Sequence, residues 1–238
     1  MEEGSSVKRQ VIALGGGGFS MEPDNLALDR YILSQSEEKE PRICFIPTAS
    51  GDKPEYIRRF YEAFGRLTCK PCHLSLFEPL FQNLHDFVLE QDILYVGGGS
   101  TRNLLVLWQE WELDGIIAEA YQNGVILAGI SAGANCWFED GVTDPLNGPL
   151  YAIEGLGMLS GSICPHFDGE IKRRPAYLEA IGKGTMKEGY GVDDGAALHF
   201  VDEQLIHVIC SRRNTPAYKI SRQGVETFEE AIPAAYLD

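Results

Sequence analysis

Basic residues are scarce in this sequence relative to acidic ones. Its 238 residues include 20 Lys and Arg against 35 Asp and Glu, which gives a formal net charge of −15. Proteins that bind nucleic acid or an anionic membrane surface concentrate Lys and Arg, because those cations displace counterions. We therefore expect neither nucleic acid nor a membrane surface as a partner.

Long apolar runs are also absent. No stretch of about 18 apolar residues occurs, so no segment predicts a helix that spans a bilayer. Residues 1–10 lack the apolar region of a signal peptide. Six cysteines without an export signal are typical of reduced thiols. We accordingly expect a cytoplasmic protein without a disulfide framework.

Short apolar runs and turn residues alternate through the first half of the chain. The apolar content of 44% is that of a globular protein, and we expect one α/β domain over residues 1–238. The runs predict strands at 11–14, 43–46, 93–96 and 125–128, and helices from about 23, over 55–67 and over 101–121, the last broken near Asp114 and Gly115. This order predicts a mainly parallel central sheet with helices on both faces.

The pattern changes after about residue 185. Four short β-rich runs follow, at 196–201, 205–210, 217–220 and 225–228, and turn residues separate them. We expect these antiparallel C-terminal strands to form a meander that closes the edge of the central sheet.

The most informative motif directly follows the expected strand at 125–128. The sequence Gly-Ile-Ser-Ala-Gly-Ala-Asn, residues 129–135, fits G-x-S-x-G between a strand and a helix. Glycines on both sides permit a sharp turn that exposes the Ser131 hydroxyl, and the Ala132 N–H lies at a helix N-terminus where it can stabilise an oxyanion. The alternative is a glycine-rich turn with an incidental serine.

A second glycine turn, Gly97-Gly98-Gly99, follows the preceding strand. The helix between the two strands makes them parallel, so both turns lie at the same sheet edge, where open α/β sheets bind ligands. Gly99 can then supply a second oxyanion donor. A phosphate-binding loop is the alternative, but G-x-G-x-x-G fails because Arg102 stands at the last position.

A nucleophilic serine needs a base and a carboxylate that orients the base. Of five histidines, His166 alone follows a short strand directly and precedes a turn. The residue pattern leaves Asp193, Asp194, Asp168 and Asp144 open as the acid, since acidic residues are also common in ordinary turns.

These motifs together resemble the peptidase E (aspartyl dipeptidase) family of serine peptidases, which is related to cyanophycinase. The motifs that carry the resemblance, in chain order, are Gly97 to Thr101, Gly129 to Asn135, Pro165-His166-Phe167 and Asp194-Gly195. The resemblance implies a fold similar to class I glutamine amidotransferases and no metal or other cofactor. It also implies a Ser131–His166–Asp194 triad, with Gly99 and Ala132 in the oxyanion hole.

The resemblance further implies a short peptide as substrate, with N-terminal Asp as one option. Asp144 resembles a family acid suited to a substrate amine or to loop support. The segment after His166 is shorter than in the aspartyl dipeptidases, which leaves the Asp preference open. Arg173 or Arg174 matches a substrate carboxylate in shape, although a solvated helix start is the favoured interpretation of both.

Other functions remain compatible with the sequence. These are a cyanophycinase-like β-aspartyl peptidase or another amidohydrolase, and a non-catalytic binding module on the same fold. A homo-oligomer is also compatible, and the sequence leaves the oligomeric state open. Cys69 and Cys72 form a C-x-x-C pair for which a redox role is the minority interpretation.

Overall fold

The computed structural model describes residues 7–144 and 150–238. The N-terminal segment used to judge export therefore lies partly outside the described residues. The helices are α1 (Gly18–Met21), α2 (Ala27–Leu33), the 3₁₀ turn η1 (Thr48–Ser50), α3 (Pro54–Phe64), α4 (Leu84–Leu89), α5 (Thr101–Glu110), α6 (Leu113–Gln122), α7 (Ala132–Asn135) and α8 (Arg173–Gly182). No helix in this part of the chain is long and apolar enough to cross a membrane.

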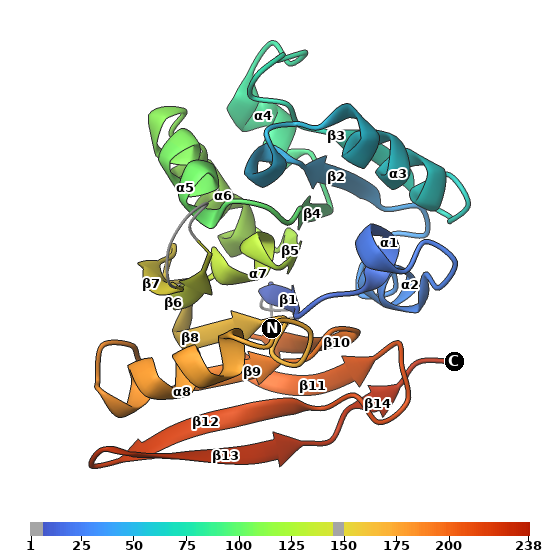
Figure 1. Cartoon of the computed structure of the whole chain (residues 1–238). Helices are drawn as coiled ribbons and strands as arrows, with labels where there is room; N and C mark the ends of the chain where they lie inside the picture. The colour runs from blue at the N-terminus through green and yellow to red at the C-terminus, as the bar shows by residue number, and fades with distance from the viewer. Residues whose placement is uncertain (1–6, 145–149) are drawn as a thin grey trace, which may run out of the picture.

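Two sheets organise the molecule (Figure 1). The eight-stranded sheet has the order β14-β11-β10-β1-β5-β4-β2-β3, with β1 (Gln10–Leu14), β2 (Arg42–Ile46), β3 (Lys70–His73), β4 (Ile93–Val96), β5 (Ile126–Ile130), β10 (Ala196–Val201), β11 (Gln204–Cys210) and β14 (Ala235–Tyr236). The six-stranded sheet has the order β13-β12-β9-β8-β6-β7, with β6 (Phe138–Thr143), β7 (Tyr151–Glu154), β8 (Leu159–Pro165), β9 (Gly189–Val192), β12 (Ala217–Gln223) and β13 (Glu226–Ile232).

The first sheet confirms the predicted α/β architecture. Strands β1 to β5 are parallel, and β1 alternates its side chains between two buried clusters. Val11 and Ala13 pack in the cluster covered by α4 to α7, whereas Ile12 and Leu14 pack in the cluster covered by α1 to α3. Burial on both faces explains why β1, β2, β4 and β5 are apolar runs, whereas the partly exposed edge strand β3, with the sequence KPCH, is not.

The late strands correct one prediction. β10 and β11 close the edge of the first sheet, as expected, but β12 and β13 belong to the second sheet, where β12 pairs with β9. Strand periodicity marks a strand but does not identify its partner, and β9 with its sequence GYGV has too few apolar residues to predict a strand. β6 and β7 were not predicted either, because β6 interrupts its apolar residues with polar ones and glycine, and β7 is short and mostly exposed.

The helical break also lies earlier than expected. α5 and α6 are separated at Trp111 and Glu112, where Glu112 adopts a left-handed φ of 53°, and not at Asp114 and Gly115. Gly115 lies within α6 with open space around it, so this glycine is tolerated in a helix without ending it.

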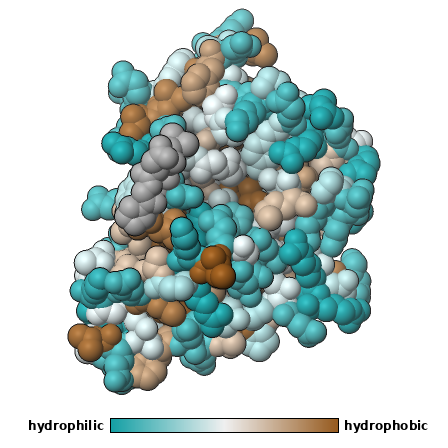
Figure 2. All heavy atoms as spheres, viewed as in Figure 1, coloured by the Kyte–Doolittle hydropathy of each residue, from teal (hydrophilic) through white to brown (hydrophobic). Residues whose placement is uncertain are grey.

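Hydrophilic residues cover most of the face shown in Figure 2, and the exposed apolar side chains are scattered. α8 packs on the second sheet through Tyr177 and Ile181, which meet Val142, Phe167 and Ile220 in a third apolar cluster.

One buried carboxyl is unusual. Asp29 in α2 is 0% exposed, and neither of its oxygens has a hydrogen-bond partner among the described residues. Burial raises the pKa of Asp29 from 3.8 to about 7. Between these values the unfolded chain releases a proton that the folded protein keeps, so the free energy of unfolding decreases as pH rises from about 4 to about 7.

We expect Asp29→Asn to remove this pH dependence. Urea denaturation at pH 4.5 and pH 7.5 should show the variant gaining about 2–4 kcal/mol relative to wild type at the higher pH. Asp24→Asn, at an exposed position of the preceding turn, is the control and should follow wild type. Parallel pH profiles for Asp29→Asn and wild type would contradict the assignment.

Candidate active site

The site lies where the carboxyl ends of β1, β4 and β5 meet the end of β8 from the second sheet. The backbone N–H of Ser131, after β5, donates to the carbonyl of Leu14 at 3.2 Å. The N–H of His166, after β8, donates to the carbonyl of the next residue, Gly15, at 3.1 Å. Two successive carbonyls at the end of β1 therefore hold the predicted nucleophile and the predicted base.

The turn at Ser131 is sharp. Its φ of 58° and ψ of −111° are strained for a residue with a side chain. A Cβ on Gly129 would lie 2.1 Å from the carbonyl oxygen of Gly133, and a Cβ on Gly133 would lie 2.2 Å from that of Val96. Only glycine fits at either position, so the spacing of the motif follows from the packing of β5, α7 and β4.

The second glycine turn lies against this serine. A Cβ on Gly98 would be 3.4 Å from Ser131 Cβ and 3.9 Å from its Oγ. Gly99 has a φ of 144°, and a Cβ there would strike the Ala49 carbonyl at 2.1 Å. Within the described chain, the N–H groups of Gly99 and Ala132 donate to no protein acceptor. Both donors are thus free to bind a ligand oxygen.

Neighbouring residues fix the glycine turn. The Gly97 N–H donates to the Ile46 carbonyl at 3.0 Å, and the Gly98 N–H donates to the Tyr56 hydroxyl at 3.2 Å. Tyr56 is itself buried and accepts a hydrogen bond from the Ser20 hydroxyl at 2.9 Å. With these two amides directed into the protein, the peptide planes before Gly99 are held in one orientation.

His166 is paired with Asp194. The imidazole Nδ1 lies 2.6 Å from Asp194 Oδ1, and both side chains are mostly buried, at 13% and 14% exposure. A Cβ on Gly16 would lie 2.0 Å from Asp194 Oδ1, and one on Gly169 would lie 2.3 Å from its Oδ2. The carboxyl is enclosed by glycine backbone, which fixes its position against the ring.

The Asp194 backbone is held as firmly as its side chain. Its N–H donates to Asp168 Oδ1 at 2.8 Å, and the next N–H, from Gly195, donates to the Gly16 carbonyl at 3.1 Å. The structure therefore brings Asp194, of the four acids left open by the sequence pattern, against the imidazole. Sequence reasoning considered Asp168 only as a candidate for the triad acid and assigned no role to Gly16 or Tyr56, because loop glycines and helix aromatics carry no distinguishing signal.

Asp193 faces a different environment. It is 5% exposed, and its Oδ1 has no hydrogen-bond partner in the described structure. Burial, together with the carboxylates of Asp168 and Asp194, raises the pKa of Asp193 to about 7. The imidazole of His166 bonds to its neighbour Asp194 instead.

The Ser131 hydroxyl makes no hydrogen bond to His166 within 3.5 Å in the described residues. Catalytic hydrogen bonds are often long in the absence of substrate and shorten in the substrate complex. With its Nδ1 bound to an acid, the ring can present Nε2 as the base toward a hydroxyl, so the arrangement suits acyl transfer.

The predicted substrate-binding residues are distributed differently. Arg173 is buried. Its Nε donates to the Glu170 carboxylate at 2.6 Å, and its Nη1 donates to the Val142 carbonyl at 3.0 Å. The prediction that Arg173 is a solvated residue at a helix start is therefore wrong. Arg174 packs its guanidinium over the Phe167 ring at 5.0 Å and pairs with a glutamate of β13.

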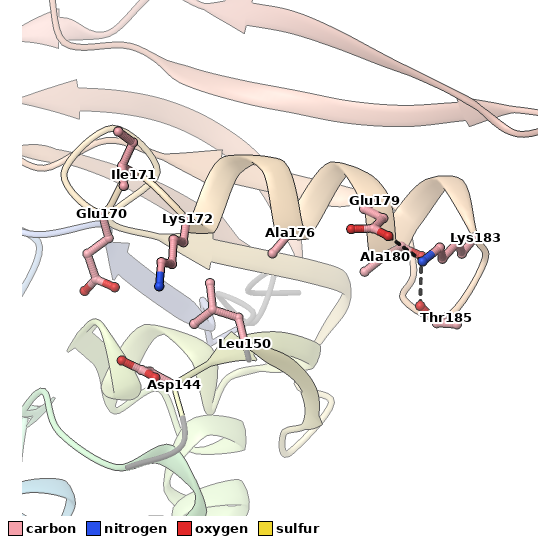
Figure 3. Close-up of a pocket in the computed structure, with 10 residues that line it drawn as sticks. All are labelled: Asp144, Leu150, Glu170, Ile171, Lys172, Ala176, Glu179, Ala180, Lys183 and Thr185. Carbon is pink, nitrogen blue, oxygen red and sulfur yellow. Dashed lines mark hydrogen bonds and ion pairs between the residues drawn. The ribbon is translucent and has the colours of Figure 1, made fainter. Parts of the chain in front are cut away.

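Asp144 is exposed and lines a pocket of about 690 Å³ (Figure 3). The pocket lies between the end of β6 and α8, and Asp144, Glu170 and Lys172 direct their charged ends into it. Glu170 is paired with Arg173, whereas Lys172 has no ion pair within the described residues. Among the described residues, the pocket therefore presents Asp144 and Lys172 as charged groups that form no ion pair.

Comparison with known proteins assigns the class. Residues 11–208 match the model of peptidase family S51, and the chain belongs to this family. It is therefore a serine-type peptidase. The chain is also 58% identical over 229 residues to the uncharacterized peptidase YgaJ of Bacillus subtilis (strain 168), covering 96% of this chain and 99% of that protein.

Two solved structures share the fold. A peptidase from an acI-B1 actinobacterium matches with a TM-score of 0.71 at 20% identity, over 96% of each chain. A putative peptidase E protein from Listeria monocytogenes EGD-e matches with a TM-score of 0.64 at 18% identity, over 85% of this chain and 98% of that one. The fold is thus the class I glutamine amidotransferase-like fold of peptidase E-like proteins, as the resemblance to that family implied.

Proposed function

We propose that the protein hydrolyses short peptides through a Ser131–His166–Asp194 triad. The observation that carries this proposal is the 2.6 Å contact between His166 Nδ1 and Asp194 Oδ1, at the strand end that also anchors the Ser131 amide. A buried carboxylate in this position holds one tautomer of the ring and stabilises its protonated form.

The proposed reaction proceeds through an acyl-enzyme. Ser131 attacks the scissile carbonyl while His166 Nε2 accepts its proton. The N–H groups of Gly99 and Ala132 stabilise the oxyanion, each by about 3–4 kcal/mol. His166 then protonates the leaving amine, and water hydrolyses the ester by the same steps in reverse.

The pocket supports a small substrate. Its volume of about 690 Å³ lies in the range of small-molecule sites, about 300–1,000 Å³. None of Ser131, His166 and Asp194 lines this pocket, but its lining residue Glu170 donates its N–H to the His166 carbonyl at 3.1 Å, so the pocket lies beside the triad. Asp144 suits the free amine of a peptide, and Lys172 suits a carboxylate, since Arg173 is engaged with Glu170. We infer that Lys172 binds a carboxylate of the substrate, which can be the side chain of an Asp residue.

We also infer that the protein acts in the cytoplasm, where its six free thiols stay reduced.

A dipeptide library tests the proposal. We expect the wild-type protein to hydrolyse short peptides with a free N-terminus. Asp144→Asn should have a higher KM for these peptides, and Lys172→Met should have a higher KM for Asp-X substrates. Lys183→Met, which removes another lysine of the same pocket that is paired with Glu179, is the matched control. Cleavage of β-Asp-Arg but not of Asp-X would favour the cyanophycinase-like alternative.

A fluorophosphonate probe addresses the remaining alternative. Such a probe reacts with an activated serine, so peptide mapping should find the adduct on Ser131. An unlabelled Ser131 in the folded protein would favour a binding module without catalysis.

We expect Tyr56→Phe to lower kcat by about 10- to 100-fold, because loss of the hydroxyl frees the Gly98 amide and the oxyanion turn with it. KM should change little, since Tyr56 is a positioning residue and contacts no substrate. Tyr61→Phe is the control, because this tyrosine lies on the same helix and bonds His73 outside the site. Equal kcat values for the two variants would contradict a role for the Tyr56 hydroxyl.

A further inference from the structure

The C-x-x-C motif leads to a different cysteine pair in the folded protein. β2 and β3 are parallel, and their register places Cys44 directly opposite Cys72. Adjacent strands lie about 4.8 Å apart, and disulfides join Cα atoms about 4.4–6.8 Å apart. The two backbones therefore lie at a separation that a disulfide can bridge.

Both thiols are on the same face of the sheet. Cys44 belongs to the cluster beneath α4 to α7, and Cys72 packs against that cluster. Cys69 packs against the cluster on the opposite face, where its thiol approaches the Phe64 carbonyl at 3.5 Å. The sheet thus separates Cys69 from Cys72 and brings Cys72 to Cys44.

The two thiols differ in access and in acidity. Cys44 is fully buried, whereas Cys72 is partly exposed and donates to Gln91 Oε1 at 3.3 Å. The neighbouring Cys44 thiol and the Arg42 guanidinium lower the pKa of Cys72 against the effect of burial, and burial raises that of Cys44. An accessible, more acidic thiol beside a buried one is the arrangement of an attacking and a resolving cysteine.

We propose that Cys44 and Cys72 are a modification site, at which a peroxide oxidises the pair to a reversible disulfide. The Cys72 thiolate attacks a peroxide oxygen, the O–O bond breaks, and a sulfenic acid and hydroxide form. Cys44 sulfur then attacks the sulfenic sulfur, and the S–O bond breaks. The leaving hydroxide combines with the proton of the Cys44 thiol as water, and the peroxide has accepted the two electrons that the thiols lost.

The position of β3 makes this closure feasible. Among the described residues, β3 is the edge strand of the eight-stranded sheet and pairs with β2 alone, so it can shift toward β2 without losing a second partner. A disulfide would tie this edge to the sheet and constrain the unfolded chain between the two cysteines. We therefore expect the oxidised protein to be more stable than the reduced one.

Treatment of the full-length folded protein with hydrogen peroxide tests the proposal. After free thiols are blocked with iodoacetamide, peptide mapping should show a Cys44–Cys72 cross-link that dithiothreitol reverses. The Tm of the oxidised protein should rise by about 5 °C over that of the reduced protein.

Three variants make the result specific. Cys69→Ser should form the cross-link as wild type does, whereas Cys72→Ser and Cys44→Ala should not form it. Cys72→Ser alters a partly exposed position, so it remains informative if the buried Cys44→Ala variant does not fold. A cross-link between Cys69 and Cys72, or sulfinic acid at Cys72 with Cys44 still a free thiol, would overturn the proposal.

Discussion

Replacement of Ser131 by alanine is expected to lower kcat by at least about 10⁴-fold, because no other group supplies the attacking oxygen. The residual rate should come from peptide binding and from the donors of Gly99 and Ala132, which remain in place. Steady-state hydrolysis of the best dipeptide from the library, with a KM determined alongside, measures the effect. The loss should fall on kcat.

The folded state should be preserved in this variant. Ser131 makes no side-chain hydrogen bond among the described residues, and its positive φ tolerates alanine as it tolerates serine. Ser160→Ala, at an exposed position on β8, provides the matched control and should retain the wild-type rate. Wild-type turnover by Ser131→Ala would remove the nucleophile from the proposed mechanism.

Replacement of Asp194 by asparagine is expected to lower kcat by about 10⁴-fold, the loss seen when the acid of such a triad becomes an amide. The amide nitrogen favours the wrong tautomer of His166 and does not stabilise its charged form. The enclosure of this side chain by Gly16 and Gly169 leaves asparagine no room to turn away. The position of the side chain at 194 against His166 should therefore be unchanged, while His166 loses its function as the base.

Asp193→Asn separates the two adjacent acids. Asp193 carries no hydrogen bond to the imidazole, so its amide variant should lose less than about tenfold in kcat. The same dipeptide assay, run on both variants at one pH, gives the comparison. A greater loss in Asp193→Asn than in Asp194→Asn would reverse the assignment of the triad acid.

In the parallel half of the fold, β1, β2, β4 and β5 were predictable because they are buried on both faces, whereas the partly exposed edge strand β3 was not predicted. Ile93 to Val96 form a strand with the predicted bounds, and Gly97 follows it as expected. β5 instead continues through Gly129 to Ile130, two residues beyond its predicted end. The second sheet was predictable only in part. The runs that form β12, β13 and the end of β8 were predicted as strands, whereas β6, β7 and β9 were not, because β6 and β9 contain glycine and β7 is short and mostly exposed. Their pairing depends on contacts between segments far apart in the sequence, such as β9 with β12.

The candidate active site also combines residues that the sequence predicts with residues that only the tertiary structure identifies. Ser131, His166 and the two glycine turns carry local sequence signals, and the structure brings them to adjacent strand ends. Sequence alone left four acids open, since only the tertiary packing of Gly16 and Gly169 decides which carboxyl reaches the ring. The engagement of Arg173 by Glu170 was equally hidden, because it depends on how α8 meets β6.

The end of β1 has a consequence for the dynamics of the molecule. The amides of Ser131 and His166 both depend on its last carbonyls, and β1 lies between β10 and β5 inside the larger sheet. A strand so enclosed cannot separate through local fluctuation. Hydrogen exchange at these two amides should therefore require opening of the whole domain, with protection factors as high as those of the slowest core amides.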